Sequence, residues 1–176
     1  MKNAAVSQLS GRQHANVRSL LTWCVILLAA LAGVFTYRIT TYDFKTLDDQ
    51  KYTWNELKGD WVVVNYFAKW CAPCLREVPE LNAFYEASQG DGVAMFMVSY
   101  DPLSAQELTS IQQEYKISVP IIVPSDNVVM PNTHPRFLPA TFIINPQGGV
   151  AMELFGEQTA QSLMTTLKAL QETESN

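Results

Sequence analysis

Two cysteines, Cys71 and Cys74, stand two residues apart in the run Trp70-Cys71-Ala72-Pro73-Cys74. Thiols at this C-x-x-C spacing can close a small disulfide ring and reopen it, which is the chemistry of thiol–disulfide exchange. A structural zinc site needs four ligands, and the sequence has no second pair to complete one. Covalent haem attachment needs His after the second Cys, where this chain has Leu75. A bond that closes so short a loop adds little stability, so we expect a reactive pair.

The segments before and after the two cysteines predict where the pair lies in the fold. The preceding run, residues 61–68, is β-branched and aromatic and indicates a buried strand. The following run, residues 75–85, has apolar residues at helical spacing. Cys71 is therefore expected at a helix N-terminus, where unpaired N–H groups favour the thiolate and lower its pKa below about 8.5. Cys71 is our predicted nucleophile, and Cys74, one turn further in and less exposed, is the predicted resolving thiol.

Further residues around the pair resemble a known family. The chain is similar to the thioredoxin superfamily, and within it to the TlpA/ResA/CcmG branch of membrane-tethered, extracytoplasmic thioredoxins. The resemblance covers roughly residues 42–170. It rests on the W-C-x-P-C motif together with these positions: Asn65 six residues before Cys71, Glu77 three after Cys74, Pro79, the segment 138–144 with Pro139, the turn 145–149 and the lead-in 57–61.

The resemblance implies an α/β, thioredoxin-like fold, with a central mixed β-sheet flanked by helices and preceded by one N-terminal transmembrane helix. The pattern of the chain agrees with an α/β sheet that has a reversed edge. Ser104 and Glu107 have the form of a capping box and predict a helix to about Lys116. Residues 140–145 and 150–155 flank a Gly-rich turn and predict an antiparallel pair, and a last helix is expected from Thr159 to about Leu170.

The resemblance also implies a set of site residues. The catalytic residues would be Cys71, Cys74 and Glu77, with a Cys71–Cys74 disulfide and with no metal and no cofactor. A cis Pro139, with Leu138 before it and Trp70 beside the thiols, would bind the substrate backbone by strand addition. If Glu77 is buried, desolvation raises its pKa and it can exchange a proton with Cys74. The alternative, an exposed helix carboxylate, stays open at this point, as do an ordinary strand-start proline for Pro139 and a simple hydrogen-bonding role for Asn65.

The N-terminal part divides the chain. Residues 20–37 are apolar and uncharged, about 27 Å long as a helix, and Lys2, Arg12 and Arg18 precede them. By the positive-inside rule we expect a cytoplasmic tail at 1–19, a transmembrane anchor at 20–38 and an exported domain at 39–176. A cleaved signal ending near Ala30-Leu31-Ala32 is the alternative. The expected location is the bacterial inner membrane, single-pass, with the catalytic domain on the periplasmic side.

The exported part is acidic. From residue 39 onward it has eight Lys and Arg against seventeen Asp and Glu, a formal net charge of −9. Such a surface argues against nucleic acid as a partner. Outside the apolar segment, which contains Cys24, only Cys71 and Cys74 remain, so there is no framework of structural disulfides.

The resemblance implies an oxidoreductase that reduces specific disulfide-bearing exported proteins, such as haem- or copper-binding proteins during maturation (cytochrome c biogenesis among them). A membrane-embedded electron donor of the DsbD/CcdA type would re-reduce the pair. Three alternatives stay open: a disulfide donor, a copper-binding assembly factor that uses Cys71, Cys74 and His134, and a non-catalytic docking module.

Overall fold

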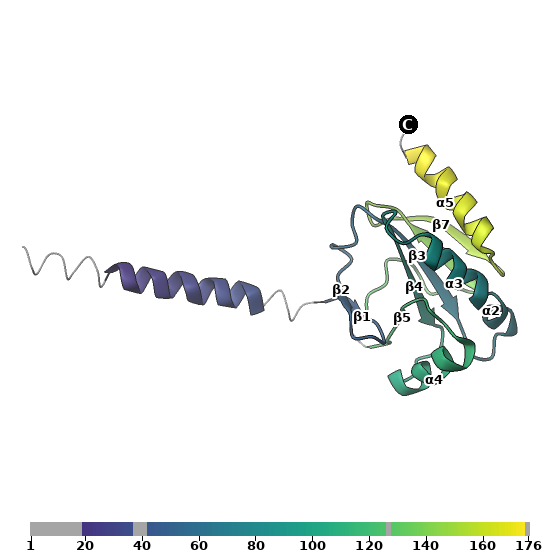
Figure 1. Cartoon of the computed structure of the whole chain (residues 1–176), viewed down its shortest axis with the longest axis horizontal. Coiled ribbons are helices and arrows are strands. Elements are labelled where there is room, and N and C mark those ends of the chain that lie inside the picture. Colours follow the sequence, from purple (N-terminus) through teal and green to yellow (C-terminus); the bar gives the residue numbers. More distant parts are fainter. Residues whose placement is uncertain (1–18, 37–41, 126–127, 175–176) are drawn as a thin grey trace, which may run out of the picture. The chain divides into compact units, whose positions relative to one another are not determined.

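The computed structural model describes residues 19–36, 42–125 and 128–174 of the chain (Figure 1). It divides into two compact units, Met1–Thr41 and Tyr42–Asn176. This boundary lies close to the predicted one at residue 39.

The described part of the first unit is the helix Ser19–Thr36. Its mean hydropathy is 2.2, none of it is buried within the structure, and it is long and apolar enough to cross a membrane. A signal sequence has the same properties, so both interpretations of this segment remain. Residues 1–18 of the predicted tail (1–19) and residues 37–38 of the predicted span (20–38) lie outside the described residues.

The second unit is built on a mixed five-stranded sheet (Figure 1). Its strand order is β5-β4-β3-β6-β7, in which β3, β4 and β5 are parallel and β6 and β7 are antiparallel to their neighbours. A separate antiparallel pair, β1 and β2, precedes it. The strands are β1 Phe44–Lys45, β2 Lys51–Tyr52, β3 Trp61–Phe67, β4 Val93–Ser99, β5 Ile121–Ile122, β6 Ala140–Ile144 and β7 Val150–Phe155. The mixed sheet with a reversed edge confirms the expected fold.

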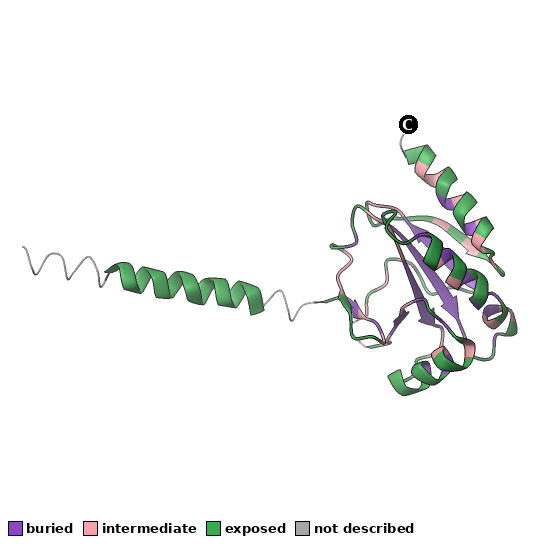
Figure 2. Cartoon of the chain, in the orientation of Figure 1, coloured by how far each residue is buried: buried purple, intermediate pink, exposed green. Residues whose placement is uncertain are grey.

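The core lies on both faces of the sheet, and β3 at its centre is buried along its whole length (Figure 2). Because side chains alternate along a strand, Val63 and Phe67 enter one core cluster and Val62 and Val64 enter the other. The buried residues of α3, α4 and α5 all belong to the first cluster. The helices are α2 Ala72–Arg76, α3 Val78–Ala87, α4 Ala105–Tyr115 and α5 Ala160–Glu174.

The helix that follows the cysteines is interrupted close to Pro79, the residue that the resemblance identifies as the kink in the first helix. It breaks at Glu77, which ends α2 and begins α3, and Pro79 occupies the first turn of α3. Proline has no N–H to donate and is tolerated at such a position. The capping box of Ser104 and Glu107 confirms the predicted start of α4, and α5 continues four residues past the predicted Leu170.

Candidate active site

The two cysteines lie where β3 gives way to α2, as predicted. Cys71 is the N-cap residue of α2, and its Sγ accepts a hydrogen bond from the backbone N–H of Cys74 at 3.3 Å. The sulfur atoms are joined in a disulfide, with the Cα atoms 5.3 Å apart. Cys71 is 5% exposed and Cys74 is fully buried. After reduction, the Cys74 N–H would still point at Cys71 Sγ and would stabilise its thiolate.

Glu77 is buried beside this helix, with 2% of its surface exposed. Burial raises the pKa of its carboxyl from 4.5 to about 7. Two hydrogen bonds oppose that rise: the backbone N–H of Gln158 donates to Oε2 and Asn65 Nδ2 donates to Oε1, each at 2.8 Å. The negative charge of Glu157 adds to the rise. The exposed-carboxylate alternative therefore does not describe this residue.

Asn65 connects Glu77 to the sheet. It lies on β3 opposite Thr141 of β6, and its Nδ2 also donates to Thr141 Oγ1 at 3.1 Å. Its Oδ1 is buried with no hydrogen-bond partner in the described part of the chain. Sequence reasoning did not find Thr141 or Gln158. Thr141 lies two residues after Pro139, so its place near the site could have been predicted from the sequence. No residue near Gln158 in the sequence indicates that Gln158 contacts Glu77.

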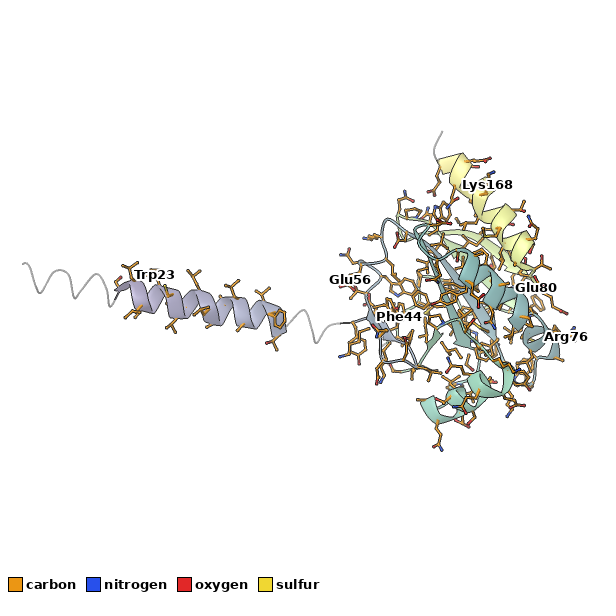
Figure 3. All side chains as sticks on the ribbon, viewed as in Figure 1. Trp23, Phe44, Glu56, Arg76, Glu80 and Lys168 are labelled. Atoms are coloured by element: carbon orange, nitrogen blue, oxygen red, sulfur yellow. A yellow bond between two sulfur atoms is a disulfide. The ribbon has the colours of Figure 1, made fainter. Side chains whose placement is uncertain are left out.

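The start of α5 is held against α2 and α3 by acidic side chains. Arg76 forms an ion pair with Glu157, and the backbone N–H of Ala160 donates to Glu80 Oε2 at 2.9 Å. Figure 3 labels Arg76 and Glu80 among the side chains of the domain. With the bond from Gln158 to Glu77, these contacts join two segments about eighty residues apart in sequence. Arg76 and Glu80 thus contact the start of α5 although both are exposed to solvent.

The Leu138–Pro139 peptide bond is cis, as the resemblance implies. Pro139 is buried at the start of β6, and Leu138 is half-buried. The carbonyl of Pro139 accepts a hydrogen bond from the N–H of Gly156 at 3.0 Å. This bond ties the segment before β6 to the end of β7.

Trp70 projects from the surface next to Cys71, with 66% of its area exposed. Its Nε1 donates to Asp101 Oδ2 at 2.8 Å, and its ring lies edge-on to Tyr100 with centroids 6.1 Å apart. Both partners follow β4, which is the neighbour of β3. The indole is thus oriented by residues that sequence reasoning did not single out.

With Cys71 and Cys74 joined in a disulfide, the two cysteines and His134 do not form the copper site that a copper-binding assembly factor would need. Within the described ranges, no three His, Cys, Asp or Glu side chains lie close enough together to hold a metal ion. His134 instead packs on the ring of Tyr100, with centroids 4.3 Å apart.

Comparison with known proteins agrees with this geometry. The model of the AhpC/TSA family matches residues 37–152. The crystal structure of StoA from Bacillus subtilis superposes with a TM-score of 0.60 at 25% identity, over 69% of this chain and 92% of that one. The fold and the cysteine pair define a thioredoxin-like protein, and the chain belongs to the AhpC/TSA family.

Curated relatives carry related names. Sporulation thiol-disulfide oxidoreductase A of Bacillus subtilis is 26% identical over 60% of this chain and 66% of its own length. Thiol-disulfide oxidoreductase ResA of Bacillus thuringiensis (strain Al Hakam) is 27% identical over 70% of this chain and 71% of its own. The cysteine pair and these relatives support thiol–disulfide exchange as the activity.

Proposed function

We propose that this protein is an extracytoplasmic thiol–disulfide oxidoreductase that reduces disulfides of specific exported proteins. The observation that carries the proposal is the Cys71–Cys74 pair, with Cys71 at the N-cap of α2 and Cys74 buried behind it. Burial of the second thiol separates the roles, because only the more accessible sulfur can meet a protein substrate.

The reaction begins with the reduced pair. The Cys71 thiolate attacks one sulfur of the substrate disulfide, which forms a mixed disulfide and releases the other substrate sulfur as a thiolate. Cys74 then attacks Cys71 Sγ, and the first substrate sulfur leaves. Two electrons pass to the substrate, which ends as a dithiol, and the enzyme ends as the Cys71–Cys74 disulfide.

Glu77 serves the second step in this proposal. Cys74 is buried, and it must lose its proton before it can attack. A carboxyl group with a pKa of about 7, three residues further along, can accept that proton and later return it. A carboxyl with an ordinary pKa would be a weaker base at neutral pH.

The substrate is bound beside the pair. We assign the docking surface to Trp70 and to the cis Leu138–Pro139 segment, where a substrate strand can pair with the backbone. Such backbone pairing adds affinity without reading the substrate's sequence, so any preference among exported substrates has to come from side-chain contacts.

The location and the partners belong to the same proposal. The Ser19–Thr36 helix would anchor the chain in the bacterial cytoplasmic membrane, with the acidic domain outside and residues 1–18 inside. The substrates would be exported proteins whose cysteines must be reduced, such as haem- or copper-binding proteins. A membrane-embedded dithiol protein of the DsbD/CcdA type would supply the electrons.

The reduction potential tests the direction. It would be measured on the full chain in detergent, in thiol redox buffers, with Cys24→Ser to remove the one other thiol. We expect a value near or below about −250 mV, in the range of thioredoxin. A value near about −120 mV, in the range of strong oxidants, would make the protein a disulfide donor instead. Failure to exchange at all would favour the docking module.

A further inference from the structure

Two aromatic side chains, Phe137 and Phe155, lie exposed on either side of the cis proline. Phe137 is 69% exposed and Phe155 is 52% exposed, and their rings meet edge-to-face with centroids 6.1 Å apart. Phe137 precedes Pro139 by two residues. Phe155 of β7 pairs in register with Ala140 of β6, the residue directly after Pro139. The two rings therefore form one aromatic pair across the β6–β7 end of the sheet.

Just beyond Phe155, one hydrogen bond joins the chain to the cis proline, and two contacts join it to α2 and its C-cap residue. Gly156 donates to the Pro139 carbonyl, Glu157 pairs with Arg76, and Gln158 donates to Glu77. Arg136 directly precedes Phe137, and Glu153 and Glu157 lie two residues on either side of Phe155; of these charges, Glu157 is paired with Arg76. The two rings nevertheless remain exposed to solvent as an apolar patch next to the cis proline.

The backbone between the aromatic pair and the proline is also free. Leu138 has neither its N–H nor its carbonyl in a hydrogen bond with any described residue. An extended segment of another chain can pair with such groups, and its alternate side chains then face the surface beside them. Free backbone groups and exposed rings in one place favour an extended peptide as the occupant over a small solute.

We propose that Phe137 and Phe155 bind an apolar side chain of the substrate protein, close to the cysteine that Cys71 attacks. This inference rests on the proposed function and adds selectivity to it. Pairing with Leu138 would hold any extended segment, and the aromatic pair would favour segments that carry Leu, Met or Phe near the reactive cysteine. Burying such a side chain favours binding in proportion to the apolar area covered.

The test uses short synthetic peptides, each with one cysteine in a mixed disulfide with glutathione. One series carries Leu in turn at each position within three residues of the cysteine, and the reference peptide carries Ser at all of them. The reduced full chain in detergent, with Cys24→Ser, would react about tenfold faster with one Leu peptide than with the reference. Phe137→Ser combined with Phe155→Ser would bring that rate ratio close to one.

Val150→Ser is the matched control, since Val150 is 43% exposed at the opposite end of β7 from Phe155. It should keep the tenfold ratio. A ratio near one in the unsubstituted chain, or a ratio that survives both Phe substitutions, would overturn the inference while leaving the proposed function intact. Loss of all exchange, with glutathione disulfide as well as with peptides, would refute the proposed function itself. A dimer in detergent that the Phe substitutions dissociate would assign the aromatic pair to a second copy and also overturn the inference.

Discussion

Asn65 Nδ2 donates to Glu77 Oε1 at 2.8 Å inside the protein, and both residues are almost fully buried. The bond stabilises the ionised carboxyl, whereas burial destabilises it. The balance leaves the pKa of Glu77 at about 7, where the group can both accept and release a proton near neutrality. Asn65 is in this sense a positioning residue for Glu77.

The first prediction concerns the pH dependence of exchange. The rate of reduction of glutathione disulfide should show an inflection near pH 7 that reports Glu77. Glu77→Gln should remove this inflection and slow the resolving step at pH 8 by about 10²-fold, since an amide cannot accept the Cys74 proton. Glu80→Gln changes an exposed carboxyl on the same helix and should keep the inflection. Identical profiles for the Glu77 variant and the unchanged chain would contradict a proton-transfer role.

The second prediction concerns the effect of the Asn65 hydrogen bond on the pKa of Glu77. Asn65→Ala removes a hydrogen bond to a carboxylate, so the inflection should move upward by about one to two pH units. Thr141→Val removes the other acceptor of the Asn65 amide, leaves the bond to Glu77, and should keep the inflection near pH 7. An unmoved inflection in Asn65→Ala would show that Asn65 does not set the proton affinity.

The third prediction is a dependence of stability on pH. Folding raises the pKa of Glu77 from 4.5 to about 7, so the folded state binds the extra proton between these values. The contribution to stability is complete below about pH 4.5 and is lost as the pH rises through 7. It amounts to roughly 3 kcal/mol in total. Urea unfolding of the oxidised chain between pH 4.5 and 8 should show this loss, and Glu77→Gln should flatten it. If the free energy of unfolding of the unchanged chain instead rises between pH 4.5 and 8, and that of the variant does not, the pKa of Glu77 is lowered by folding. That result would contradict the prediction.

The fourth prediction separates the two cysteines. Cys74→Ser leaves Cys71 able to attack but removes the thiol that resolves the mixed disulfide, so covalent adducts with peptide or protein substrates should accumulate. With both variants made in the Cys24→Ser chain, Cys71→Ser should form none, because Cys74 has no exposed surface. Non-reducing gel electrophoresis and mass spectrometry would detect the adducts. Adducts on Cys74 instead of Cys71 would show that Cys74 is the attacking thiol and Cys71 the resolving one.

Local patterns in the sequence were sufficient for much of this protein. The spacing of Cys71 and Cys74, the strand before them and the capping box at Ser104 depend on residues a few positions apart, so the chain alone determines them. The apolar run within 20–37 is likewise a property of composition. The broken helix at Glu77 was harder to predict, because the apolar periodicity continues across the break and only Pro79 signals it.

The surroundings of the thiols depended on the tertiary structure. Glu77 meets Gln158, and Trp70 meets Asp101, only because the sheet order places β4 and β6 beside β3 and the β7–α5 link against α2. Burial then raises the pKa of Glu77, and no neighbour in sequence could supply that burial. The sequence by itself determined the spacing of the two cysteines and so predicted which sulfur atoms react. The packing of distant segments decided the proton affinity of the Glu77 carboxyl and placed the aromatic pair next to the cis proline, because both depend on which surfaces the fold covers.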